Sequence, residues 1–276
     1  MEQILNYFSA GICSLSWQQI VMFVIGGILI WLATAKNYEP MLLLPIGFGA
    51  ILVNLPLAVV LGTSEHPGAL QILFDFGIMT ELFPLLIFIG VGAMIDFTPL
   101  LERPWLLVFG LVAHSGIFIA AFVAYHCFGF DLKEALSIGI IGAADGPTAI
   151  VVASKHAENL LGQITVVAYS YMSLVPIIMP PVIKLLTTKK ERRMRIYAKN
   201  KNIPKAALII FPVAVTLVVS LIIPDAAALI GFLMFGNLIR ECGVLEKLSK
   251  AAQNELSNIV TLLLGISVGA TMTADK

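Results

Sequence analysis

The sequence predicts an all-α, polytopic integral membrane protein. Of its 276 residues, 59% are hydrophobic and only 12% are charged, whereas an ordinary soluble domain has about 45–50% apolar and about 25% charged residues. Apolar runs of about 17–25 residues, the length that crosses a bilayer, recur from one end of the chain to the other. Together these observations exclude a soluble enzyme, a nucleic-acid binder and a disordered chain.

Six apolar stretches precede the one strongly polar part of the chain. The first, residues 17–35, stops at Lys36 and carries Trp17 and Trp31 near its ends, where interfacial anchors are expected. A short mixed segment, residues 67–81, is expected at the membrane interface. The other stretches cover residues 40–62, 82–101, 104–129, 136–153 and 161–186.

A basic segment follows, and its charge predicts the orientation of the chain. Nine of the 17 Lys and Arg residues lie within residues 184–205, against a single acid, Glu191. The positive-inside rule places this loop in the cytoplasm. The basic run either sets topology alone or also docks a soluble partner or anionic lipid. Three further apolar stretches and an amphipathic connector come after it: residues 206–223, 225–239, 257–272 and 240–255.

Two pairs of segments in the chain resemble each other. IGFGAILVN (residues 46–54) resembles IGFLMFGN (residues 230–237), and LIFIGVGAMID (residues 86–96) resembles LLLGISVGATMTAD (residues 262–275). The segments come in the same order in both halves of the chain, and the members of each pair are separated by nearly the same number of residues. Internal repeats of this kind are typical of secondary transporters, whose ion sites lie where the repeats meet.

The repeat predicts how the chain is divided. Residues 1–186 are expected to form a first membrane repeat with an extra first span, residues 187–205 the cytoplasmic loop, and residues 206–276 a partial second repeat. Inverted repeats need an odd number of crossings each, so residues 136–153, interrupted by Asp-Gly-Pro, are the candidate for a broken or re-entrant helix. No counterpart of residues 97–186 follows residues 262–275, so the second repeat is expected to be truncated.

Asp145 is the main candidate for a functional residue. A carboxylate deep in an apolar stretch costs about 2.5–3.5 kcal/mol on insertion scales, which makes it a functional-site hypothesis. Gly142, Gly146 and Pro147 interrupt the helix around it. Freed carbonyls, the carboxylate and the Thr148 hydroxyl suit a hard cation, which takes oxygen ligands. The alternative is a protonated aspartate that caps a half-helix.

Other polar residues in apolar stretches have two interpretations each. Tyr169, Tyr171 and Ser173 either make hydrogen bonds between helices or supply a proton donor or ligand contact beside Asp145. Asn54 and Asn237, which end the paired glycine-rich segments, either join helices by hydrogen bonds or act as uncharged cation ligands.

The chain resembles one known family in three segments. They are GVGAMIDFTPLL (residues 90–101), IGIIGAADGPTAIVV (residues 138–152) and VAYSYMSLVPIIMPPVIKLLTTKKER (residues 167–192). The family is the membrane β subunit of sodium-pumping, biotin-dependent decarboxylases, such as those of oxaloacetate, glutaconyl-CoA, methylmalonyl-CoA and malonate. The resemblance covers nearly the whole chain from about Trp17 onward.

The resemblance implies an activity and partners. The β subunit decarboxylates carboxybiotin, which a carboxyltransferase and biotin-carrier α subunit presents, and couples this step to Na⁺ export and proton consumption. Na⁺ and carboxybiotin, not covalently bound here, are thus the implied cofactors. A small single-span γ subunit and membrane lipid are the other implied partners, and no nucleic acid is expected. The implied location is the bacterial inner membrane.

The resemblance also assigns residues, while the residues alone leave other functions open. The essential intramembrane aspartate of the family falls on Asp145, which the resemblance implies binds Na⁺ and exchanges it for a proton. Gly146 and Thr148, beside it at the helix break, are the other expected Na⁺-binding residues. The functional tyrosine falls on Tyr171, with Tyr169 as the neighbouring possibility. Without the resemblance, a stand-alone cation/proton or organic-anion carrier, or an inactive truncated membrane subunit, would suit the same lone aspartate and repeat.

Overall fold

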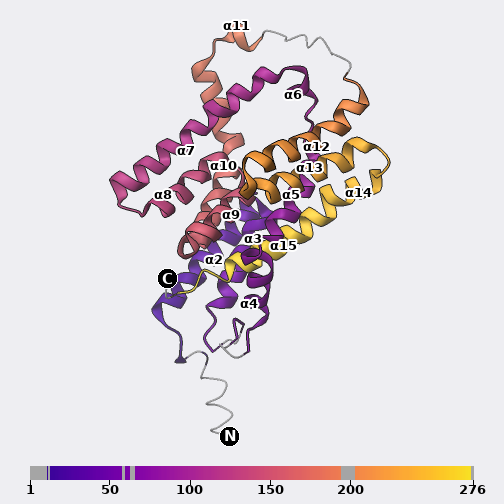
Figure 1. The fold of residues 1–276 in the computed structure, drawn as a ribbon. Coiled ribbons are helices and arrows are strands. Elements are labelled where there is room, and N and C mark those ends of the chain that lie inside the picture. Colours follow the sequence, from indigo (N-terminus) through magenta and orange to yellow (C-terminus); the bar gives the residue numbers. More distant parts are fainter. Residues whose placement is uncertain (1–10, 12, 58–59, 63–65, 194–202, 275–276) are drawn as a thin grey trace.

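The computed structural model describes residues 11, 13–57, 60–62, 66–193 and 203–274, except for the side chains of residues 172–174 and 176–177. Helices dominate the described residues, which contain no β-strand (Figure 1). The longer helices are α2 (Trp17–Ala35), α3 (Pro40–Val53), α5 (Leu82–Met94), α7 (Leu107–Phe128), α10 (Leu161–Leu186), α12 (Lys205–Ile222), α13 (Ala227–Cys242) and α15 (Ser257–Gly269). Shorter helices connect them: α4 (Ala69–Phe74), α6 (Thr98–Glu102), α8 (Leu132–Gly139), α9 (Gly146–His156), α11 (Lys189–Arg192) and α14 (Glu246–Ala251).

The helices confirm the predicted membrane class. Within the described residues, α2, the helical stretch Pro104–Phe128 and α12 are long and apolar enough to cross a bilayer. A fourth span is possible if Ala69–Met79 and Leu82–Met94, which are bent by 57° at a short break, are counted as one. The first and sixth predicted stretches coincide with α2 and α10. The connector of residues 240–255 is mostly helical, because it contains the end of α13, α14 and most of a π-helical turn, Ala252–Leu256.

Glycines bring α2 and α3 into contact. Ser16 caps α2 in a capping box: its hydroxyl accepts from the Gln19 amide at 3.2 Å, and the Gln19 side chain accepts from the Ser16 amide at 2.9 Å. Further along, a Cβ on Gly26 would lie 2.7 Å from the Gly47 carbonyl oxygen. The two backbones can approach this closely because neither glycine has a side chain.

The four similar segments lie on helices that form two tightly packed pairs, α5 with α13 and α3 with α15. The Asn237 amide of α13 donates to the carbonyls of Gly92 and Ile95 at 3.4 and 3.0 Å. In the same way, the Asn54 amide after α3 donates to the Met272 carbonyl at 2.7 Å. In each packed pair, therefore, the asparagine that ends a segment from one half of the chain is hydrogen-bonded to the end of a segment from the other half.

The direction of each helix follows from these contacts. In each pair the two helices pack side by side. The C-terminal end of α5 meets the C-terminal half of α13, and the C-terminal ends of α3 and α15 also meet. The two helices of each pair therefore run parallel. A Cβ on Gly90, late in α5, would collide with Ser257 at the start of α15, so α5 and α15 run antiparallel. Each echoed helix thus runs opposite to its counterpart. This supports the inverted repeat, which stays a prediction, as does the division of the chain at residues 186 and 205.

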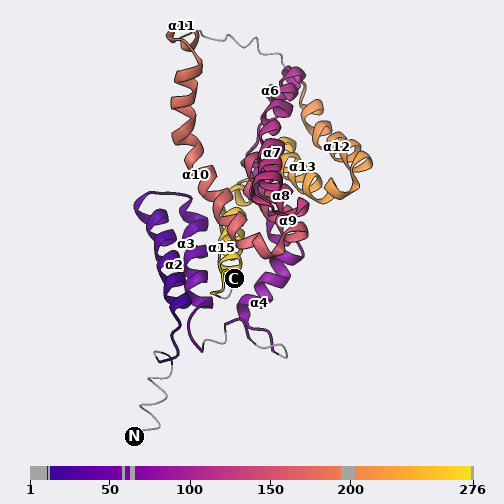
Figure 2. The same ribbon diagram turned by 90° about the vertical axis from the view of Figure 1, so that its left-hand side faces the viewer.

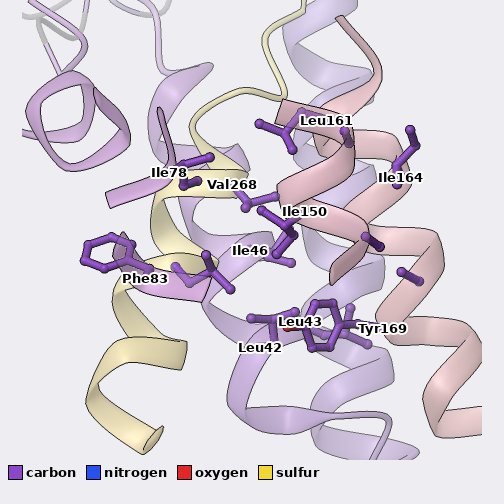
Figure 3. Packing of buried hydrophobic residues seen from close by; sticks show 14 of the residues in the cluster. Leu42, Leu43, Ile46, Ile78, Phe83, Ile150, Leu161, Ile164, Tyr169 and Val268 are labelled. Atoms are coloured by element: carbon purple, nitrogen blue, oxygen red, sulfur yellow. The ribbon is translucent and has the colours of Figure 1, made fainter. Parts of the chain in front are cut away.

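The buried core lies where α3, α9, α10 and α15 meet (Figure 3). Its largest fully buried side chains include Leu43, Ile46, Ile150, Leu161 and Leu264. The second half of α10 leaves this core and extends away from the other helices toward α11 (Figure 2). The core therefore fixes α9 and the first half of α10, the two elements that carry the candidate site.

Candidate functional site

The helix around Asp145 breaks where the Asp-Gly-Pro motif predicts. An Asp131 capping box with Glu134 starts α8, and a 3-10 turn, Ile140–Ala143, follows it. Ala144 then adopts φ +54°, in the left-handed region. A new helix, α9, starts at Gly146 with Pro147 in its first turn. Pro147 has no amide hydrogen to donate, so it is tolerated at the start of a helix but not in its interior.

Asp145 is the residue that precedes α9, in the N-cap position. Its carboxylate accepts a hydrogen bond from the Thr148 hydroxyl, one turn into the helix. The amides at the first turn of α9 give this end of the helix a partial positive charge, which stabilises an ionised carboxylate. Asp145 is half-buried. The Asp145 carboxyl group is thus held at a helix break among apolar side chains.

Gly146 lets an aromatic ring close the site. A Cβ on Gly146 would collide with the ring of Tyr169, so the ring packs directly on the backbone at the start of α9. Tyr169 is only 6% exposed and lies beside Leu42 and Leu43 of α3 (Figure 3). Gly146 therefore has a steric role next to Asp145, in addition to any carbonyl it presents.

Asp145 opens onto a cavity of about 510 Å³. Small-molecule sites typically have volumes of about 300–1,000 Å³ and mostly apolar walls with a few polar groups. Four of the lining residues have a side-chain oxygen: Glu39, Asp145, Tyr169 and Thr261. The other lining residues are apolar: Met41, Leu42, Ile87, Phe88, Val91, Ile95, Ala144, Pro147 and Leu233. Such a cavity has room for a hydrated cation beside the carboxylate.

The two candidate tyrosines face different surroundings. Residues two positions apart on an α-helix point to different faces. Tyr169 lines the cavity together with Asp145 and Glu39. Tyr171 is 38% exposed and does not line this cavity. The structure thus brings Tyr169 to Asp145, whereas a role for Tyr171 stays a prediction. The Ser173 side chain lies outside the described residues.

The two asparagines do not meet Asp145. Besides Met272, the Asn54 amide donates to the Ala50 carbonyl at 2.7 Å, and its side-chain oxygen accepts from the Ala274 amide at 2.7 Å. Asn237 holds the end of α5 and is 1% exposed. Neither residue lines the Asp145 cavity. Their contacts favour the interpretation of hydrogen bonds between helices over that of cation ligands.

Glu39 and Thr261 are cavity residues that the sequence reasoning missed. Glu39 precedes the second apolar stretch, a position that resembles an ordinary interfacial acid, and Thr261 is a small hydroxyl in the last stretch. For Glu39, the sequence signal that could have revealed it was its place directly before Pro40, at the start of α3. Among the described residues, no three His, Cys, Asp or Glu side chains form a group that could hold a metal ion.

Comparison with known proteins identifies close relatives. The profile of the family described as the Na⁺-transporting oxaloacetate decarboxylase beta subunit matches residues 18–276. The chain is 47% identical over 267 residues to the beta subunit of glutaconyl-CoA decarboxylase from Acidaminococcus fermentans, covering 97% of this chain and 70% of the relative.

Two other relatives have different substrates in their names. The chain is 45% identical over 297 residues to the beta subunit of methylmalonyl-CoA decarboxylase from Propionigenium modestum, covering 100% of this chain and 75% of the relative. It is 42% identical over 325 residues to the oxaloacetate decarboxylase beta chain of Klebsiella pneumoniae, covering 96% of this chain and 74% of the relative.

Proposed function

The chain belongs to the family of Na⁺-transporting decarboxylase beta subunits, and from this premise we propose that it couples the decarboxylation of carboxybiotin to Na⁺ export and proton consumption. The family is biotin-dependent, embedded in the membrane, and works within a multi-subunit complex. Membership favours the pump over a stand-alone carrier or an inactive remnant. The observation that carries the proposal is Asp145, held at a helix break and open to a cavity.

The partners of the chain are part of the proposal. An α subunit with carboxyltransferase and biotin-carrier parts supplies the carboxylated biotin, and a small single-span γ subunit joins the membrane assembly. The names of the relatives carry three different substrates at similar identity. We therefore assign the choice of acid to the carboxyltransferase partner, because the membrane step is shared by all three.

Asp145 is proposed to hold Na⁺ and a proton in turn. Its ionised carboxylate is a hard oxygen ligand that suits Na⁺, and the same carboxylate releases the ion when it takes up a proton. Thr148 orients the carboxylate through the hydroxyl hydrogen bond. Carboxybiotin, when a partner presents it, supplies the free energy of CO₂ release and needs a proton. Tyr169 borders the cavity and is proposed to hold or move that proton.

The proposal is tested on the intact complex purified from its native membrane in mild detergent. CO₂ release is measured with oxaloacetate, glutaconyl-CoA, methylmalonyl-CoA and malonate, each with and without Na⁺ and with and without avidin. We expect one substrate to give CO₂ release that requires Na⁺ and is blocked by avidin. CO₂ release that avidin does not reduce, or an intact complex without a biotinylated partner, would contradict the pump assignment.

A further inference from the structure

A second acidic residue lines the Asp145 cavity from a different part of the fold. Glu39 precedes α3 and lines the cavity with Asp145 and Tyr169. Its backbone is fixed at φ +35°, with Pro40 as the next residue. Its carbonyl accepts the amides of Leu42 and Leu43 at 3.1 and 3.0 Å. The first turn of α3 thus holds this acidic residue at the cavity wall.

The Glu39 carboxylate has no cationic partner in the described part of the chain. Lys36, three residues earlier, places its ammonium 5.5 Å from the centre of the Trp31 ring instead. The ion pairs among the described residues join Lys155 to Glu81, Arg240 to Glu241 and Lys250 to Glu246. Glu39 is half-buried, so its charge acts on the cavity with less screening than a fully exposed charge.

Glu39 also lies on the side from which exported Na⁺ must come. The start of α3 lies on the same side as the start of α15, because the two helices run parallel. The start of α15 follows the end of α13 through α14. The end of α13 is on the side where α12 begins, because a Cβ on Gly243, just after α13, would lie 2.9 Å from the Lys205 Nζ at the start of α12. The basic loop ends at Lys205 and is predicted to be cytoplasmic.

We propose that Glu39 recruits Na⁺ from the cytoplasmic side into the cavity and thereby sets the Na⁺ affinity of the Asp145 site. The proposal rests on the pump function stated above. Two carboxylates on one apolar-walled cavity focus a negative potential, which raises the local concentration of cations. Asp145 then holds the ion that undergoes exchange with a proton, while the role of Glu39 is to attract Na⁺ into the cavity.

The test is the substitution Glu39→Gln in the intact complex. The half-saturating Na⁺ concentration is measured in two ways, by ²²Na⁺ equilibrium binding and by the Na⁺ dependence of CO₂ release. We expect it to rise about tenfold, which corresponds to about 1.4 kcal/mol, and to rise more than the maximal rate falls. Added choline chloride should weaken Na⁺ binding more in the wild-type complex than in Glu39→Gln, since salt screens an electrostatic attraction.

Glu81→Gln is the matched control. Glu81 likewise precedes a helix, α5, with a left-handed backbone at φ +62°. Its carboxylate is paired with Lys155 at 2.7 Å and does not line the cavity. We expect Glu81→Gln to change the half-saturating Na⁺ concentration less than about twofold. Glu39→Asp, which keeps the charge, should stay within about threefold of the wild type, and it keeps the test valid if Glu39→Gln does not assemble.

The outcomes separate this proposal from the pump assignment. If the wild-type complex needs Na⁺ but Glu39→Gln binds it with unchanged affinity, the role of Glu39 is wrong and the pump assignment stands. If Glu39→Asp raises the half-saturating concentration as much as Glu39→Gln, packing and not charge is responsible, and the proposal is again wrong. If the wild-type complex needs neither Na⁺ nor biotin, both proposals fail together.

Discussion

The two asparagine-held helix pairs and the broken helix α8–α9 use buried polar groups in opposite ways. In the pairs, Asn54 and Asn237 donate to backbone carbonyls at helix ends, and neither reaches the cavity. At the break, the Asp145 carboxylate has the Thr148 hydroxyl as a partner and faces a cavity of about 510 Å³. The neutral amides join helices, whereas the acid borders a cavity, where we propose that it binds an ion.

This difference matters because unsatisfied polar groups are costly in an apolar setting. The role of a polar side chain whose hydrogen bonds are made within the protein is to stabilise the fold. For a carboxylate that borders a cavity, as Asp145 does, we propose a role in ligand binding instead. Removing the polar group should therefore reduce stability in the helix pairs and reduce activity at the break.

The largest expected effect is that of Asp145→Asn on activity. Asparagine is as good an N-cap as aspartate and can still accept from Thr148, so α9 should form normally. Without the charge, Na⁺-dependent CO₂ release by the complex should fall by about 100-fold or more, with an almost unchanged melting temperature. Asp96→Asn is the control: Asp96 accepts from the Thr98 amide at 2.9 Å and does not line the cavity. An Asp145→Asn complex that keeps its Na⁺ dependence would contradict the site.

A smaller effect, on stability, is expected for Gly92→Ala. The added Cβ would collide with the Leu233 backbone carbonyl, which cannot rotate away as a side chain could. We expect α5 and α13 to separate at a cost of about 2 kcal/mol in the free energy of unfolding. Thermal unfolding in detergent measures it. Gly110→Ala in α7, where the Cβ meets nothing within 4 Å, is the matched control and should be neutral or stabilising.

The smallest effect is expected for Asn237→Ala. It removes the hydrogen bonds to the carbonyls of Gly92 and Ile95 and should lower the free energy of unfolding by about 1 kcal/mol. Na⁺ affinity should not change, because Asn237 does not line the cavity. The control is Asn258→Ala, at an exposed position on α15. If Asn237→Ala weakened Na⁺ binding without loss of stability, Asn237 would be a ligand after all.

The sequence by itself determined the membrane class, most helix positions and the break at Asp145. Composition and the length of apolar runs decide whether a chain is stable in a bilayer, and α2 and α10 coincide with the predicted stretches. The Asp-Gly-Pro break is also local, because proline and glycine act on the backbone of their own turn. Asp145 was found for the same reason: a charge in an apolar run is visible without the fold.

The tertiary structure decided which distant residues share the site. Tyr169 and Tyr171 are equivalent in the sequence pattern, and the packing of α10 against α3 and α9 turned Tyr169 to the cavity. Glu39 joins Asp145 because α3 packs beside α10. Asn237 reaches Gly92 because small residues let α5 and α13 approach closely. Such contacts depend on how helices far apart in the chain pack together, which no local sequence pattern specifies.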